Sequence, residues 1–121
     1  FQNSLFFFLF KWTINRRLYL KKVIGKENFT LQPEFVLQDK FRLDGKAIRA
    51  IKYVADFLVK DGDNDIVVDA KGMTTPVFKL KEKLFKYKFR KSIVLLKTKK
   101  DMRAFALSLK HIKLKIPLEE L

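Results

Sequence analysis

Two apolar runs in the middle of the chain are separated by a short polar stretch. The runs, YVADFLV at 53–59 and IVVDA at 66–70, are rich in the β-branched and aromatic residues that favour strands. Between them lies DGDN at 61–64, four residues that are typical of turns. The pattern predicts a β-hairpin with a four-residue loop, closed by the pair Lys60 and Asp65.

The register of this hairpin brings charged residues together. Counting outward from the closing pair, Asp56 lies directly opposite Asp69. Because side chains in a strand alternate between faces with a period of two, Asp56, Asp69 and Lys71 are predicted to project to one side. Two facing carboxylates repel each other in an ordinary sheet. We therefore expect a cation between them.

The segment before this hairpin predicts another one. Asp44-Gly45 is typical of a two-residue hairpin turn. Pairing outward from that turn without a bulge places Pro33 opposite Asp56 and leaves Gln32 on the other face, whereas a β-bulge would reverse this. The odd positions over 47–59 are almost all apolar, so we expect that face to pack on the core and the even face, with Asp56, to be functional.

Further elements are predicted after the hairpin. Thr75 and Pro76 are a favourable cap and first residue for a helix that runs to about Phe89. Lys81 and Lys88 fall inside the apolar arc of that helix, so each must reach solvent or find a partner. The order strand, helix, strand indicates a right-handed crossover and a mixed sheet. The later predictions are a buried strand in SIVLL at 92–96, a short helix in MRAFALSL at 102–109 and, in HIKLKIPLEEL, an edge strand before Pro117.

The start of the chain is strongly apolar. LFFFLF at 5–10 is too short to cross a bilayer, which needs about 20 residues. Apolar residues at i, i+4 spacing predict a helix over about 5–19 instead. With a core over about 29–98 and an extension over about 99–121, we predict a single α/β domain, residues 1–121, with a mixed central β-sheet flanked by helices.

Composition narrows the function. The chain has no cysteine and one histidine, which excludes disulfides, thiolate zinc sites and histidine-based metal clusters, and fits a reducing cytoplasm. Its formal net charge of +14 predicts a polyanionic partner. Nucleic acid is favoured over an anionic membrane surface, because the basic residues are interleaved with strand and helix patterns rather than gathered in a tail.

The two aspartates suggest which cation the site would hold. Mg²⁺ takes oxygen ligands, often one or two carboxylates completed by water and substrate phosphate. Asp56 and Asp69 would supply those carboxylates. Lys71 on the same face could orient or help deprotonate an attacking water and offset phosphate charge. The turn itself invites an EF-hand interpretation, because Asp61, Asp63 and Asp65 have the right spacing. Position twelve is Gly72 rather than glutamate and the flanks resemble strands, so a solvated turn is favoured.

The arrangement of Asp56, a hairpin and Asp69-Ala70-Lys71 resembles the PD-(D/E)XK nuclease signature. IRAIKYVADF, IVVDAKGMTT and FKLKEKLFKYKF, together with LQPEF at 31–35, resemble a small phage- and prophage-encoded branch of that superfamily over roughly 29–98. The resemblance implies a restriction-endonuclease-like core and a DNA endonuclease that uses Mg²⁺ or Mn²⁺ in the cytoplasm of the host cell. We expect the Ala70 carbonyl to be an additional metal ligand. The basic side chains of Lys79, Lys81 and Lys83 on the predicted helix would hold the DNA backbone.

Many members of that branch carry a serine followed shortly by a metal-binding glutamate on the first helix. Here Ser4 is followed by Leu5 and a run of phenylalanines, so the acid is missing. Gln32 is the accessory candidate for its place. The missing acid favours the alternative function, a non-catalytic nucleic-acid-binding or assembly protein on a degenerate nuclease fold. Paired cuts need two sites, so a homodimer is a further expectation.

Overall fold

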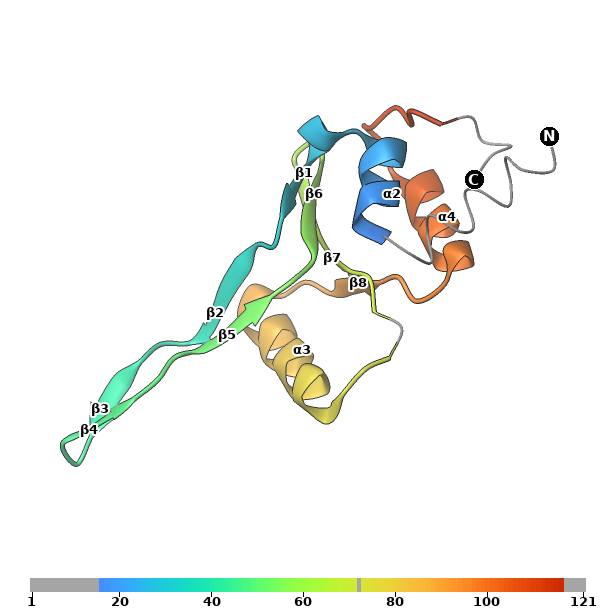
Figure 1. The fold of residues 1–121 in the computed structure, drawn as a ribbon. Helices are drawn as coiled ribbons and strands as arrows, with labels where there is room; N and C mark the ends of the chain where they lie inside the picture. The colour runs from blue at the N-terminus through green and yellow to red at the C-terminus, as the bar shows by residue number, and fades with distance from the viewer. Residues whose placement is uncertain (1–15, 72, 117–121) are drawn as a thin grey trace.

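The structure is a computed structural model that describes residues 16–71 and 73–116 (Figure 1). Its helices are α2 (Arg16–Ile24), the short 3₁₀ helix η1 (Lys26–Asn28), α3 (Pro76–Phe89) and α4 (Lys99–Ser108). The strands are β1 (Phe29–Leu31), β2 (Glu34–Gln38), β3 (Phe41–Leu43), β4 (Lys46–Ile48), β5 (Ile51–Val54), β6 (Phe57–Asp61), β7 (Asn64–Asp69) and β8 (Ile93–Leu95). The predicted helix over 5–19 lies mostly outside the described residues. Its last four positions belong to α2, which continues to Ile24.

A four-stranded mixed sheet with the order β1-β6-β7-β8 forms the centre of the fold. β1, β6 and β7 are antiparallel neighbours, while β8 runs parallel to β7 because α3 carries the chain back between them. Helices lie on both sides of this sheet, α2 and α4 on one and α3 on the other (Figure 1). The prediction of an α/β fold with a mixed central sheet flanked by helices is confirmed.

Each side of the sheet buries its own apolar cluster. The α2/α4 core joins Tyr19, Leu20 and Val23 of α2 and Met102 and Phe105 of α4 to one face of the sheet. The α3 core lies on the other face and contains the buried side chains of Leu37, Tyr53, Ala55, Val67, Phe78, Phe85 and Ile93. Neighbouring residues of β7 point into different cores, as period-two alternation requires.

The register predicted for the central hairpin is confirmed. Lys60 pairs with Asp65 and Phe57 pairs with Val68. The loop is shorter than the four residues predicted, because Asp61 also pairs with Asn64 and leaves a two-residue turn. Gly62 in that turn has φ +66°, which glycine adopts without steric cost.

The alternation along β5 and β6 is interrupted at Asp56. Tyr53 and Ala55 belong to the α3 core, whereas Phe57 and Val59 belong to the α2/α4 core. The prediction that the odd positions share one face is therefore wrong, although these four are all buried. The cause is a bend at Asp56, which lies between the two strands rather than inside one.

The upstream hairpin forms a long two-stranded arm that extends away from the sheet (Figure 1). β3 and β4 pair about the predicted Asp44-Gly45 turn. A bulge between Val36 and Gln38 then shifts the register of β2 and β5 by one residue. As a result the Gln32 N–H donates to the Asp56 carbonyl at 2.8 Å, so Gln32 rather than Pro33 lies opposite Asp56. The bulge-free prediction is wrong for this reason.

The long helix begins where predicted. Thr75 caps α3 by accepting a hydrogen bond from the Phe78 N–H. Its apolar arc is only partly buried, because the helix packs on the sheet and arm base through one stripe that includes Phe78 and Phe85. Tyr87 is 71% exposed. Lys88, predicted to need a partner, donates from Nζ to the Val36 carbonyl.

The end of the described chain is held by the central hairpin. β8 and α4 match the predicted strand and helix. α4 starts at Lys99, three residues before the predicted start, because Thr98 and Asp101 form a capping box. The edge strand predicted before Pro117 is wrong, because residues 111–116 form bends and coil. No helix of the described residues has the length and apolarity to span a membrane.

The turn predicted to be solvated is exposed at residues 62–65, but its first residue, Asp61, is a buried anchor. Asp61 is 4% exposed, and its carboxylate accepts hydrogen bonds from the Lys110 and His111 N–H groups at 3.0 and 2.7 Å. Both carboxylate oxygens of Asp61 therefore bind the backbone of the C-terminal segment. Asp61 is not available as the first calcium ligand of an EF-hand.

Candidate active site

Asp69 ends β7 with its side chain only 2% exposed. The pattern IVVDA explains the position, since three apolar residues carry the strand through the sheet and the acid falls at its last pair, opposite Leu95 of β8. The Leu96 N–H donates to the Asp69 carbonyl at 2.9 Å, which fixes the backbone there. A carboxylate is thus placed at the carboxyl end of a central strand.

Asp56 meets Asp69 from the neighbouring part of the chain. Its carboxylate accepts a 2.8 Å hydrogen bond from the Ala70 N–H, so the bend at Asp56 is tied to the residue that follows Asp69. The Asp56 side chain is also close enough to Asp69 to raise the pKa of that carboxyl by hydrogen bonding and charge. The predicted juxtaposition of the two acids is confirmed.

The surroundings of Asp69 raise the pKa of its carboxyl group. Burial raises its pKa most, the hydrogen bond and charge of Asp56 raise it further, and the opposing effects of Tyr53 and Lys71 leave the pKa at about 6. Two adjacent carboxylates repel each other, and a bound cation would offset that repulsion. Their oxygens are the donors that a hard divalent ion takes.

Tyr53 is a site residue that sequence reasoning missed. Its side chain is 3% exposed, and its hydroxyl donates to Asp69 Oδ2 at 2.6 Å. Burial, followed by the hydrogen bond to Asp69, raises the tyrosine pKa, so the hydroxyl keeps its proton as a donor. The bend at Asp56 turns Tyr53 toward Asp69. The available signal was that a buried tyrosine usually needs a hydrogen-bond partner.

Lys71 lies where the motif predicts. Its Nζ is 3.5 Å from Asp69 Oδ2 and 4.8 Å from the centroid of the Phe78 ring. The lysine side chain is about one-third exposed. Its ammonium is therefore held between a buried carboxylate and the first turn of α3, at the open edge of the site.

The other predicted residues are farther from this pair. Gln32 reaches the site through its backbone N–H, while its side chain is exposed. Lys79 and Lys83 are exposed on α3, and Lys81 is half-buried. Glu82, which sequence reasoning did not single out, is close enough to raise the pKa of Tyr53 by its charge. Its carboxylate lies 3.9 Å from the Lys86 amine.

No cluster of three or more acidic or histidine side chains with metal-binding geometry occurs within residues 16–71 and 73–116. The acidic contribution of the described chain to a metal site is thus the pair itself. Such a pair leaves most coordination positions of a divalent ion to water, backbone oxygen or a substrate phosphate.

Comparison with known proteins gives a family without an assigned activity. Residues 13–106 match the model of the family described as "Protein of unknown function (DUF1064)". The chain belongs to this family. The DUF1064 match covers both aspartates, Tyr53, Lys71, the arm and α3, so the whole candidate site lies inside the family's own domain. No curated protein and no solved structure gives a significant match.

Proposed function

We propose that this chain is a metal-dependent DNA endonuclease of the PD-(D/E)XK kind, with a restriction-endonuclease-like core, that hydrolyses phosphodiester bonds in phage or mobile-element DNA. The observation that carries the proposal is the pairing of half-buried Asp56 with buried Asp69, with the Lys71 amine 3.5 Å from Asp69. Two acids and a lysine at the end of a central strand form the charge set that metal-assisted phosphodiester hydrolysis uses. A structure-selective or junction-resolving nuclease is one form of this activity.

Asp56, Asp69 and the Ala70 carbonyl would hold Mg²⁺ or Mn²⁺. When bound, the ion supplies positive charge for the phosphate and lowers the pKa of a bound water. Tyr53 donates to one oxygen of Asp69, which limits how that carboxylate can turn. Lys71 places a positive charge beside the carboxylate, where it can orient a water and a phosphate oxygen.

The charge of the molecule supports a nucleic-acid substrate. A net charge of +14 attracts a polyanion, and the exposed Lys79 and Lys83 with half-buried Lys81 on α3 would contact the DNA backbone beside the carboxylate pair. The proposal includes action in the cytoplasm. A homodimer would place two such sites on the two strands of a duplex.

Cleavage of linear, nicked and four-way-junction DNA with millimolar Mg²⁺ or Mn²⁺ tests the proposal. We expect Asp69→Asn and Lys71→Ala to lower the cleavage rate at least about 100-fold, because each removes charge that acts on the reacting phosphate. Asp65→Ala and Lys60→Ala, exposed residues of the same hairpin, are the matched controls. Cleavage at wild-type rate by both site variants would disprove the assignment.

A non-catalytic nucleic-acid-binding protein is the second candidate. It is favoured by the internal hydrogen bonds of the acids, since Ala70 donates to Asp56 and Tyr53 donates to Asp69. A metal titration separates the two functions. If millimolar Mg²⁺ or Mn²⁺ neither raises the melting temperature nor supports cleavage of any of the three DNA substrates while DNA still binds, the non-catalytic function is correct.

A further inference from the structure

The arm carries exposed side chains that neither core uses. We define the arm tip as residues 39–49, which contain β3, β4 and the turn between them. All of these residues are exposed. From Asp56 to the turn at Asp44 the chain runs for 12 residues, which at about 3.3 Å per residue is a reach of at most roughly 40 Å. The arm tip extends away from the four-stranded sheet (Figure 1).

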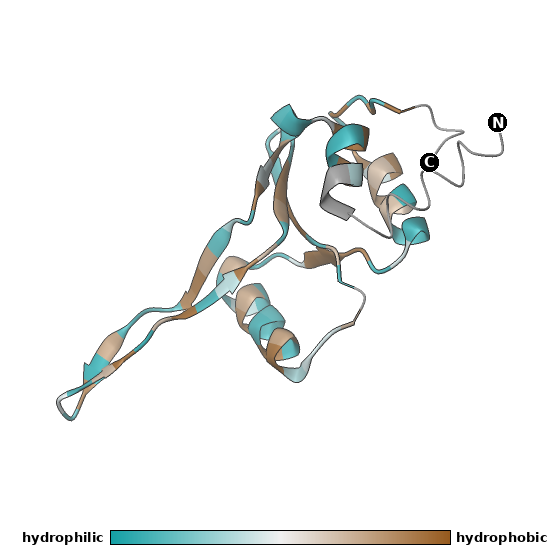
Figure 2. Ribbon diagram, viewed as in Figure 1, coloured by the Kyte–Doolittle hydropathy of each residue, from teal (hydrophilic) through white to brown (hydrophobic). Residues whose placement is uncertain are grey.

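The pairing of β3 with β4 divides the side chains of the arm tip between two faces. Phe41 lies opposite Ile48 and Leu43 lies opposite Lys46, so these four side chains share one face. Arg42 lies opposite Ala47, and the alternation places Lys40 and Arg49 with them on the other face. One face of the ribbon is therefore mainly apolar and the other mainly basic. Figure 2 shows this mixture of hydrophobic and hydrophilic residues along the arm.

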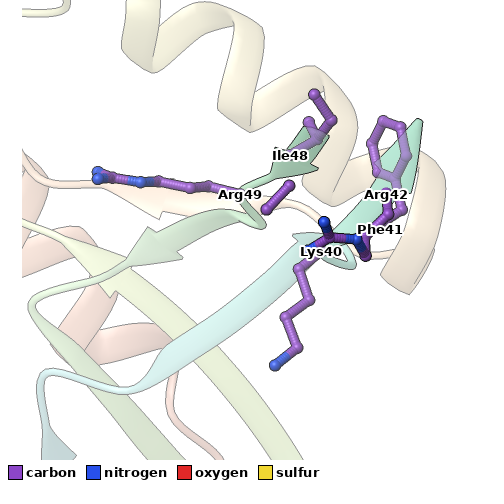
Figure 3. Close-up of a pocket in the computed structure, with 6 residues that line it drawn as sticks. Lys40, Phe41, Arg42, Ile48 and Arg49 are labelled. Atoms are coloured by element: carbon purple, nitrogen blue, oxygen red, sulfur yellow. The ribbon is translucent and has the colours of Figure 1, made fainter. Parts of the chain in front are cut away.

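The apolar face has no partner within the described protein. Phe41, Leu43 and Ile48 are 45%, 60% and 37% exposed, although side chains of this size are usually covered. A hollow of about 410 Å³ lies at the tip and is lined by both kinds of residue (Figure 3). In that view the Phe41 ring lies beside Ile48, and the charged end of Arg49 extends away from them. An apolar strip bordered by cations suits a ligand with apolar and anionic parts close together.

The base of the arm is held firmly against the site. Phe35 of β2 stacks on Tyr53 of β5 at 6.2 Å, and both rings pack against Phe85 of α3 at 5.1 and 5.9 Å. Tyr53 is also the residue that donates to Asp69. One side chain therefore belongs to the arm base, the α3 core and the candidate active site, so the arm leaves the sheet in a direction set by the residues around the carboxylates.

We propose that the arm tip binds in a groove of duplex DNA within about one helical turn, or roughly 34 Å, of the phosphate at the carboxylate pair. A two-stranded ribbon fits the major groove, and apolar wedges on such arms also enter minor grooves. The apolar face meets the bases or sugars, and Lys40, Lys46 and Arg49 reach the phosphates. The inference rests on the proposed function for the position of the second contact, but binding by the tip does not require cleavage.

Charge decides between DNA and a second copy of the chain. The tip has four basic and two acidic residues in a molecule of net charge +14, so two tips repel each other before their apolar faces can meet. DNA supplies the opposite charge along the whole length of the ribbon. A contact between the apolar faces of two copies would give the basic residues of the tip no anionic partner.

Binding measured without divalent metal on duplexes of increasing length tests the arm separately from the chemistry. Lys40, Lys46 and Arg49 are changed together to Ala. Two exposed apolar residues, Phe41 and Leu43, are changed to Ala in a second variant. For a duplex of two turns, about 21 base pairs, we expect each variant to lose at least about 10-fold in affinity. For a duplex shorter than one turn, about 8 base pairs, we expect less than about a 2-fold change.

A matched control changes three exposed basic residues of the helices on the other side of the sheet, Lys22, Lys100 and Arg103, to Ala. It should affect both duplex lengths alike. Loss of the three tip cations should also reduce the dependence of log affinity on log salt by about 3. Equal losses on long and short duplexes, or wild-type affinity in both tip variants, would overturn the proposal. So would a lower oligomeric mass in the tip variants, since that result assigns the tip to a contact between copies.

Discussion

The Tyr53 hydroxyl donates a 2.6 Å hydrogen bond to the Asp69 carboxylate, and both side chains are almost completely buried. The bond joins β5 at the base of the arm to β7 of the central sheet. A buried carboxylate without such a donor would hold its proton more tightly, because burial already raises the pKa of Asp69 to about 6. Tyr53 thus helps to keep Asp69 ionised at neutral pH.

Replacing this tyrosine should therefore raise the Asp69 pKa above about 6. We expect Tyr53→Phe to produce that shift and to lower the free energy of unfolding at pH 8 by about 1–3 kcal/mol, since the ionised carboxylate loses a buried donor. A ¹³C NMR titration of the Asp69 carboxyl carbon and urea unfolding measure the two effects. Tyr87→Phe is the control, because Tyr87 is 71% exposed. An unchanged Asp69 titration in Tyr53→Phe would contradict the prediction.

Asp69 should also make stability depend on pH. Its pKa is raised from an ordinary 3.8 to about 6, so between those values the folded protein holds a proton that the unfolded chain releases. The Asp69 contribution to the free energy of unfolding is then largest at pH 4 and decreases as pH rises toward 6.

Asp69→Asn removes this titration while keeping an oxygen that can accept from Tyr53. We expect the stability of the variant relative to wild type to rise by on the order of 2 kcal/mol between pH 4 and pH 8, with most of the change below pH 7. Urea unfolding across that range measures it, with Asp65→Asn as the exposed control. A difference between Asp69→Asn and wild type that stays constant with pH would rule out the raised pKa.

The anchor at Asp61 should be a large contributor to stability. Its carboxylate is buried and accepts two backbone N–H groups. Although burial alone raises its pKa, the N–H donors of Lys110 and His111 outweigh burial and lower the pKa. We expect Asp61→Ala to cost about 2–4 kcal/mol at pH 7, because two backbone N–H groups lose their buried, charged acceptor.

The control for this anchor is Asp63→Ala, an exposed change in the same turn that should cost less than about 0.5 kcal/mol. The lowered pKa also means that the Asp61 contribution is present above its ordinary pKa of 3.8 and is lost as pH falls through the folded value. Equal stabilities of the two variants in urea at pH 7 would show that Asp61 does not hold the C-terminal segment.

Two glycines test the contact between the turn and the C-terminal segment. Gly45 and Gly62 have φ values of +76° and +66°, so alanine is strained at both. A Cβ at Gly45 meets nothing within 4 Å, whereas one at Gly62 would lie 2.7 Å from His111 Cδ2. We expect Gly45→Ala to cost about 1 kcal/mol and Gly62→Ala at least about 1 kcal/mol more.

The excess cost at Gly62 should disappear when the imidazole ring is removed. With His111→Ala as the background, the added cost of Gly62→Ala should fall to the value for Gly45→Ala in thermal or urea unfolding. An undiminished excess in that background would mean that the ring does not occupy the space above Gly62.

The sequence predicts those parts of the fold that depend on local patterns. The register from Phe57 to Asp65 follows from turn residues and period-two alternation, and the start of α3 follows from Thr75 and Pro76. Both acids of the site and Lys71 were found in this way. The resemblance to nucleases remains a prediction, because a family without an assigned activity does not test it.

Other parts depend on contacts with no local pattern. The bulge between Val36 and Gln38 changes which residue lies opposite Asp56, and nothing in the sequence around it marks an extra residue. Likewise, no local pattern predicts the bend at Asp56, which turns the Tyr53 side chain into the site. The bonds from Lys110 and His111 to Asp61 use backbone N–H groups 49 and 50 residues away, which no side-chain pattern can report.

The bend at Asp56 has a consequence for how the length of the arm can change. The alternation of side chains between faces restarts at the bend. The face on which an arm residue lies is therefore independent of the alternation in the central sheet. Adding one residue to each strand of the arm between the bulge and the turn would lengthen the ribbon by one rung and leave Tyr53, Asp56 and Asp69 in place. An insertion of one residue between Val54 and Phe57 would instead rotate Tyr53 away from Asp69. Arm length is thus free to vary, while the spacing around Asp56 is not.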